Sequence, residues 1–274
     1  MQFAINYSPQ AEALLRAGKI DVDYFKCPDW DDLIAAARAL KPVYVHFPLA
    51  VGRGKLGEVD WAKVDRLLAE TGTPLVNVHL SPHYDDYPEG VSADEVIDCM
   101  YAELGEVVAR YGRNRVIAEN LPYYGEVHSD FYPLIPAAAD PHLIRSLIND
   151  VDCGFLFDLS HARIAADSLG MSAQEYIGAL PLDRIREIHC AGMIREETGR
   201  LEDHLGFSDL DWAALDWFMG EISTGRAAAP WVLSFEYGGI GDLFDWRSES
   251  SVIARDTPRL YRMVRGEGNV LTSP

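Results

Sequence analysis

GFLFDLSH (154–161), IREIHC (185–190) and LEDH (201–204) lie close together in the chain and set the pattern for the rest of it. The first two segments contain short apolar runs, which are typical of buried strands. Five side chains that can bind a metal follow these runs: Asp158, His161, His189, Glu202 and His204. Histidines and carboxylates are common ligands of zinc, iron and manganese. The stretch therefore predicts half of a metal site.

Apolar runs bounded by turn residues recur along the whole chain and predict eight strands. The predicted strands are Phe3–Tyr7, Val22–Lys26, Val43–Phe47, Leu75–Leu80, Val116–Asn120, Phe155–Leu159, Ile185–Cys190 and Trp231–Tyr237. Between them, apolar residues spaced three and four apart predict helices. The predicted helices are Pro9–Ala17, Trp30–Leu40, Trp61–Thr71, Ser92–Tyr111, Pro141–Asp150, Ser172–Leu180, Trp212–Ile222 and Ser248–Val264.

Eight strand–helix units without a linker-like change in composition predict an α/β fold, a single (β/α)8 TIM barrel over residues 1–274. An open doubly wound sheet is the structural alternative. That fold usually has a glycine-rich turn after its first strand, and the segment SPQAEA (8–13) contains no glycine.

The composition limits the classes of function. The chain of 274 residues has 48% hydrophobic residues and a formal net charge of −19, from 43 acidic and 24 basic residues. This acidity argues against binding to nucleic acid or to an anionic membrane. The N-terminus does not have the pattern of a signal peptide, and no apolar run has the length of a membrane helix, so we expect a cytoplasmic protein. Four cysteines without CxxC spacing are expected to be reduced and mostly buried: Cys27, Cys99, Cys153 and Cys190.

Six consecutive predicted strands end with a side chain that can bind a metal. In chain order these are His46, His79, Glu119, Asp158, His189 and Glu236. In a TIM barrel the C-terminal ends of the strands meet on one face, which is where the active site lies. Each residue alone is more often explained by a hydrogen-bonded histidine or a capping carboxylate. Together they predict a metal site at the C-terminal face.

The number of candidate ligands exceeds what one ion needs. The full set is His46, His79, Glu119, Asp158, His161, His189, Glu202, His204 and Glu236. Nine ligands suit two or three divalent ions, with Glu119 and Glu236 as the best candidates to bridge neighbouring ions. Asp203, next to Glu202, is the alternative ligand at that position.

With these motifs, the chain resembles the xylose-isomerase-like superfamily of TIM barrels over nearly its whole length. One similar branch is the endonuclease IV family, which has a trinuclear zinc site. The segments that resemble its ligand motifs are His46, His79, Glu119-Asn120, the Asp158-x-x-His161 pair, His189, the segment 202–204 and Glu236. Glu202 stands where that family has aspartate.

The local sequence of three segments more closely resembles a second branch, the multinuclear non-haem iron-dependent oxidative enzymes. This branch includes the methanobactin-biosynthesis oxidase. These segments are EIHCAGM (187–193), LEDHLGFSDLDW (201–212) and WVLSFEY (231–237). Two positions depart from the pattern of that branch: His161 replaces its usual asparagine, and Met193 replaces its usual histidine. The acidic, aromatic loop SPHYDDYPEG (81–90) also differs from the basic loops that endonuclease IV needs to enter DNA.

The resemblance implies two or three divalent metal ions, with iron first and zinc or manganese as alternatives, and oxidation of a peptide or small molecule. With a single ion on Glu119, Asp158, His189 and Glu236, a sugar or polyol isomerase or epimerase is the alternative. Glu119 and Glu236 are the expected catalytic residues. A zinc cluster would instead favour endonuclease IV-like phosphoester hydrolysis, and a barrel that only sequesters metal is the non-enzymatic alternative.

Overall fold

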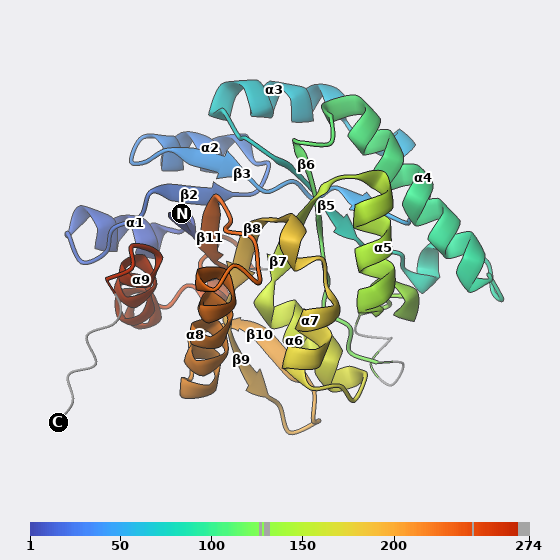
Figure 1. The fold of residues 1–274 in the computed structure, drawn as a ribbon. Coiled ribbons are helices and arrows are strands. Elements are labelled where there is room, and N and C mark those ends of the chain that lie inside the picture. The colour runs from blue at the N-terminus through green and yellow to red at the C-terminus, as the bar shows by residue number, and fades with distance from the viewer. Residues whose placement is uncertain (126–127, 129–131, 243, 268–274) are drawn as a thin grey trace.

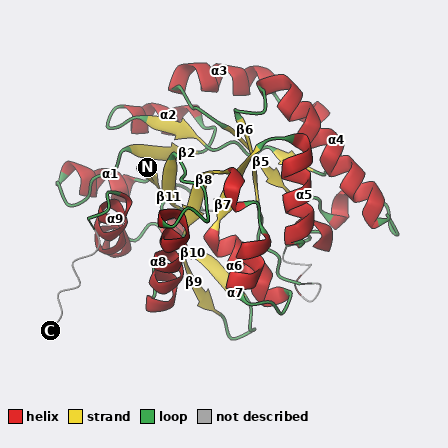
Figure 2. Ribbon diagram, in the orientation of Figure 1, coloured by secondary structure: helices red, strands yellow, loops and turns green. Residues whose placement is uncertain are grey.

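A computed structural model describes residues 1–125, 128, 132–242 and 244–267. Nine strands form one sheet in which all pairs are parallel (Figures 1 and 2). They are β1 (Gln2–Asn6), β2 (Tyr24–Cys27), β3 (Val43–Val45), β4 (Ala50–Val51), β5 (Val76–Leu80), β6 (Val116–Glu119), β7 (Gly154–Asp158), β8 (Ile185–Cys190) and β11 (Val232–Phe235). Their spatial order is β3-β2-β1-β11-β8-β7-β6-β5-β4.

The two ends of this order, β3 and β4, are halves of one chain segment, so the sheet closes into the predicted eight-stranded barrel. The third strand was predicted as Val43–Phe47, but regular pairing stops at Val45. The Phe47 N–H donates to Oδ1 of Asn77 at 2.7 Å, and the Asn77 amide donates to the Phe47 carbonyl at 2.9 Å. Pro48, which has no N–H to donate, follows directly. A side chain therefore closes the barrel where backbone pairing is interrupted.

Nine α-helices are present in the described part of the chain and lie around the sheet (Figure 2). They are α1 (Pro9–Arg16), α2 (Asp31–Arg38), α3 (Trp61–Thr71), α4 (Ala93–Tyr111), α5 (Pro141–Val151), α6 (Leu159–Ser168), α7 (Ala173–Ala179), α8 (Asp209–Ser223) and α9 (Ser250–Val264). Within the described residues, no helix is both long enough and apolar enough to cross a membrane.

Three further segments differ from the sequence-based expectation. The sixth strand ends at Asp158, and α6, which was not predicted, begins at the next residue. Asp158 ends the strand and also caps the helix, because its Oδ1 accepts the His161 N–H at 2.7 Å. The segment after β8 folds into an antiparallel hairpin of β9 (Gly192–Arg195) and β10 (Leu201–Leu205), where a loop was expected. The prediction that α8 begins at Trp212 was also wrong, because the helix begins three residues earlier at Asp209, with Ser208 as its N-cap.

Alternate residues of the barrel strands point inward and divide the interior by polarity. At the N-terminal ends of the strands, Tyr44 packs edge-on against Tyr24 and Trp231. At the C-terminal ends, the inward positions carry polar and charged side chains, and many of them are buried. The aromatic side chains fill the barrel at the N-terminal ends of the strands, so the polar side chains are gathered at the C-terminal ends.

Candidate metal centre

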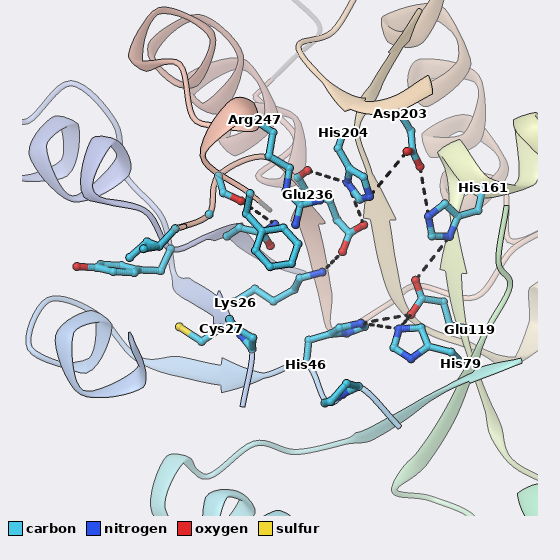
Figure 3. A pocket seen from close by; sticks show the side chains of 18 of the residues that line it. Lys26, Cys27, His46, His79, Glu119, His161, Asp203, His204, Glu236 and Arg247 are labelled. Carbon is cyan, nitrogen blue, oxygen red and sulfur yellow. Dashed lines mark hydrogen bonds and ion pairs between the residues drawn. The ribbon is translucent and has the colours of Figure 1, made fainter. Parts of the chain in front are cut away.

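The register of the barrel strands brings the six predicted strand-end residues together. His79 of β5 lies opposite Glu119 of β6, and Asp158 of β7 lies opposite His189 of β8. His46 follows β3 and Glu236 follows β11. Figure 3 shows His46, His79, Glu119 and Glu236 facing one cavity, with His161, Asp203 and His204 above them.

The first ligand group consists of His46, His79 and Glu119. Nε2 of His46 lies 3.0 Å from Nε2 of His79, and the two atoms lie 3.5 and 3.3 Å from Oε2 of Glu119. The group is part of a larger set, because Glu119 is also grouped with Asp158 and His161. Glu119 therefore lies between two groups, which suits a bridging carboxylate.

The second group consists of Asp158, His189 and Glu236. Nδ1 of His189 lies 3.2 Å from Oε1 of Glu236 and 3.4 Å from Oε1 of Glu119. Nε2 of the same ring lies 2.9 Å from Oε1 of Glu187, which is buried beneath the site. A carboxylate on one ring nitrogen fixes the histidine and directs the other nitrogen to a metal.

The third group consists of His161, Asp203 and His204. Nε2 of His161 lies 3.3 Å from Oδ2 of Asp203, and Nε2 of His204 lies 3.8 Å from Oδ1 of the same carboxylate. Glu202 was the predicted ligand at this position, but among the described residues it is Asp203 that belongs to a ligand group. The Glu202 carboxyl instead hydrogen-bonds with Glu196. The geometry thus favours Asp203, the alternative ligand, over Glu202.

A distortion of β10 explains the choice between the two acids. Neighbouring residues of a regular strand point to opposite faces. Here the pairing of β9 with β10 shifts between Glu202 and Leu205, and His204 adopts a left-handed φ of 57°. Such a bulge lets Asp203 and His204 face the same cavity. A left-handed conformation at a residue other than glycine is costly and is often found at functional sites.

Three of the histidines are held in the same way by backbone carbonyls. Nδ1 of His79 lies 2.8 Å from the Leu49 carbonyl, and Nδ1 of His161 lies 3.0 Å from the Asn120 carbonyl. Nδ1 of His204 lies 3.2 Å from the Glu236 carbonyl. Because a carbonyl can only accept, Nδ1 carries the proton in each neutral ring and Nε2 is left with its lone pair toward the ligand group.

The buried acceptors of this site fit divalent cations. Glu119 Oε2, Asp203 Oδ2 and His189 Nδ1 are buried and have no hydrogen-bond partner among the described residues. Unsatisfied buried polar atoms are rare and need an explanation such as a bound ion. Burial and the nearby Glu236 and Glu119 carboxylates raise the pKa of Asp158 to about 7, against the opposing effect of His161. A cation bound among these ligands would offset the repulsion between the carboxylates and would coordinate the unsatisfied atoms.

Two charged residues of the site were not singled out from the sequence. Lys26 of β2 is only 5% exposed, and its ammonium contacts Oε1 of Glu236 inside the barrel. Its inward position follows from the alternation of YFKC in β2, which was the available signal. Arg247 lies above Glu236 and His204 (Figure 3), stacks on Phe244 and lines the same cavity.

The cavity at the strand ends has a volume of about 560 Å³. Beyond the ligands, its walls are largely apolar and aromatic, including Trp30, Leu33, Tyr124 and Phe244. The cations in the surrounding loops are engaged elsewhere: Arg53 and Lys55 both pair with Asp86 at 2.5 Å, and Arg195 pairs with Asp167 at 2.6 Å. These arrangements favour a substrate with an apolar portion inside the cavity.

Comparison with known proteins assigns the chain to a family. The model of the family described as the RiPP precursor modification enzymes MbnB/TglH/ChrH matches residues 31–210, well over half of the chain. A UPF0276 protein of Acaryochloris marina is 26% identical over 179 residues, and this match covers 61% of each chain. A UPF0276 protein of Caulobacter vibrioides is 26% identical over 200 residues, or 71% of this chain and 68% of the relative. The match thus spans about three fifths of the Acaryochloris relative's length.

Several solved structures have the same fold. A D-tagatose 3-epimerase-like protein has a TM-score of 0.60 at 17% identity, with 97% of this chain and 99% of that chain covered. The IOLI protein, solved with a zinc atom, has a TM-score of 0.61 at 13% identity and full coverage of both chains. Endonuclease IV from Thermus thermophilus has a TM-score of 0.52 at 17% identity, covering 97% and 100%. These likenesses show the xylose-isomerase-like barrel and nothing about the reaction.

Proposed function

Because this chain belongs to the MbnB/TglH/ChrH family of RiPP precursor modification enzymes, we propose that it is an iron-dependent oxidative enzyme that acts on a peptide. The proposed cluster holds two or three ions on His46, His79, Glu119, Asp158, His161, His189, Asp203, His204 and Glu236. Zinc or manganese suits the same ligand types, so the choice of iron rests on the family.

The observation that carries this proposal is the sharing of ligands between groups. Glu119 belongs to two of the groups, and so do Asp158 and His161. Within each group, the candidate ligand atoms lie within 4.8 Å of one another. Groups that share carboxylates suit neighbouring ions better than separate sites. Buried carboxylate oxygens of Glu119 and Asp203 that have no hydrogen-bond partner among the described residues add to this argument, because a cation would offset their charge.

The protein itself holds and orients the ligands. Backbone carbonyls orient His79, His161 and His204, and Glu187 orients His189. When bound, iron would supply the redox chemistry with dioxygen. Glu119 and Glu236 are the proposed catalytic carboxylates. Burial opposes ionisation of Glu236, but Lys26 and His189 hold its pKa well below its usual range, so the carboxylate is ionised and can bind a metal ion.

The test is the mass of a candidate substrate peptide after incubation with the protein. Peptides encoded beside the gene are incubated with anaerobically purified, Fe(II)-loaded protein and then exposed to dioxygen. We expect a mass change that requires both iron and dioxygen and is lost in Glu119→Gln. His142→Ala is the control, because His142 of α5 is exposed and belongs neither to the cavity lining nor to a ligand group. An unchanged peptide mass with at least two irons bound would contradict the oxidative assignment.

One arrangement favours the alternative, an isomerase or epimerase. Glu119, Asp158, His189 and Glu236 lie together and would suffice for one divalent ion, with a glutamate moving the proton. This alternative predicts interconversion of sugars or polyols by the Mn²⁺-loaded protein without dioxygen. It also predicts that His204→Ala leaves the bound metal unchanged, whereas the proposed cluster predicts the loss of one ion.

A further inference from the structure

Lys26 places its ammonium against one of the four ligand groups. We infer that Lys26 weakens metal binding at Asp158, His189 and Glu236 and makes that position the exchangeable one of the cluster. This inference rests on the proposed multinuclear site but concerns the relative affinity of its positions.

The contacts of Lys26 are specific to this group. Its ammonium donates to Oε1 of Glu236, the oxygen that also lies 3.2 Å from Nδ1 of His189. It lies 3.4 Å from the other ring nitrogen of His189, Nε2. Figure 3 shows the Lys26 side chain reaching Glu236 from the wall of the cavity. A metal ion that uses this oxygen therefore has to share it with the ammonium or displace the ammonium.

Burial makes the charge of Lys26 effective. Lys26 is 5% exposed, and Glu236 and His189 are 7% and 0% exposed, so water screens their interactions little. A positive charge so close to a bound cation opposes binding through direct repulsion. It also satisfies Glu236, which lowers the gain from coordination.

Two of the other groups, one with His46, His79 and Glu119 and one with His161, Asp203 and His204, have no such contact among the described residues. Among the described residues, no lysine or arginine side chain forms an ion pair with Glu119 or Asp203, whereas both acids face two histidines. Arg247 lines the cavity near His204, but it makes no ion pair with a ligand in the described part of the chain. Asp158 and Glu236 give this group two carboxylates, and the Lys26 ammonium offsets one of their two negative charges.

A purely structural role for Lys26 makes the opposite prediction. If the ammonium only supported Glu236 in a ligating position, its removal would weaken metal binding. If it acts as a competing cation, its removal strengthens binding. Lys26→Met keeps most of the side-chain length without the charge, and Lys26→Arg keeps the charge. Lys26→Gln serves in place of Lys26→Met if the methionine variant does not fold.

The experiment is a titration of the metal-free protein with Mn²⁺, with heat and the electron paramagnetic resonance of free Mn²⁺ as readouts. In the wild type we expect one step at least tenfold weaker than the others. Lys26→Met should strengthen that step at least tenfold, and Lys26→Arg should leave it near the wild-type value. The gain should vanish when Glu236→Gln is also present. Urea unfolding checks that the variants remain folded.

The outcomes separate this inference from the proposed function. If the wild type binds two or three ions and Lys26→Met binds them equally or more weakly, Lys26 is not a competing cation and the inference is wrong. If the wild type binds at most one ion, the multinuclear site is wrong, and the inference falls with it.

Discussion

Single side chains decide which groups can bind metal in this barrel. The sequence predicts eight of the nine candidate ligands that the structure groups together, because each follows an apolar run or a short motif. The ninth, Asp203, could be named only as an alternative to Glu202. Simple alternation puts one of these two acids inward, but the bulge at His204 that selects Asp203 leaves no pattern in the sequence.

The two neighbouring acids provide a matched pair of variants. Asp203→Asn should remove one ion per chain, because its carboxylate joins His161 and His204. Glu202→Gln should leave the metal content unchanged, because that carboxyl hydrogen-bonds with Glu196 instead. Metal analysis of both purified variants measures the difference. Equal metal loss in both, or in neither, would show that the hairpin is not arranged as described.

Cysteine reactivity tests the packing of individual side chains. Cys27, Cys153 and Cys190 are buried, and Cys99 is partly exposed. Burial raises the pKa of the Cys27 and Cys153 thiols to about 12, so both stay protonated and unreactive near pH 8. A thiol reagent at pH 8 should modify one cysteine rapidly in the folded protein and all four after denaturation. Rapid modification of any cysteine in Cys99→Ser would contradict this packing.

At the scale of elements, the β9–β10 hairpin carries ligands that the barrel strands do not supply. Its approach to the barrel depends on a close backbone contact: a Cβ at Gly192 would lie 2.0 Å from the Gly206 carbonyl oxygen. No side chain fits there. The sequence predicted metal ligands in this segment but a loop around them, because a short hairpin with a bulge lacks the clear alternation of a strand.

Gly192→Ala should therefore displace the hairpin and weaken metal binding at the Asp203 group at least tenfold, while the barrel stays folded. Gly220→Ala is the control, because a Cβ at this position of α8 meets no atom within 4 Å. That change should stabilise the protein slightly, by about 0.5–1 kcal/mol, if it has any effect. Metal titration and urea unfolding measure both quantities. Normal metal binding by Gly192→Ala would mean that the hairpin tolerates the displacement.

The closure of the barrel depends on Asn77, which bonds both the N–H and the carbonyl of Phe47. Asn77→Ala leaves these two buried backbone groups unpaired, and each costs ~1–3 kcal/mol. We expect a loss of about 2–4 kcal/mol in the free energy of unfolding, measured with urea. Asn149→Ala, at an exposed position of α5, should change it by less than ~0.5 kcal/mol. A similarly small effect at Asn77 would show that backbone pairing alone closes the barrel.

For the whole molecule, the regular alternation of strands and helices predicted the barrel, and the strand-end residues predicted the face that carries the site. Both follow from local patterns in the chain. Lys26 was missed because a lysine in a short apolar strand does not reveal whether its ammonium is buried or reaches solvent.

The overall charge makes a prediction that separates this chain from endonuclease IV, whose fold it shares. With a formal net charge of −19, it should not bind duplex DNA with or without an abasic site at about 150 mM salt. Fluorescence anisotropy of a labelled duplex measures this directly. Micromolar binding that weakens with salt would revive the hydrolytic alternative.

The metal content per chain after anaerobic purification tests the central claim most directly. Inductively coupled plasma mass spectrometry should find two or three ions per folded chain, mainly iron, and one ion fewer in His204→Ala. His142→Ala should match the wild type. A single ion per chain, unchanged in His204→Ala, would contradict a multinuclear centre and leave the isomerase as the leading function.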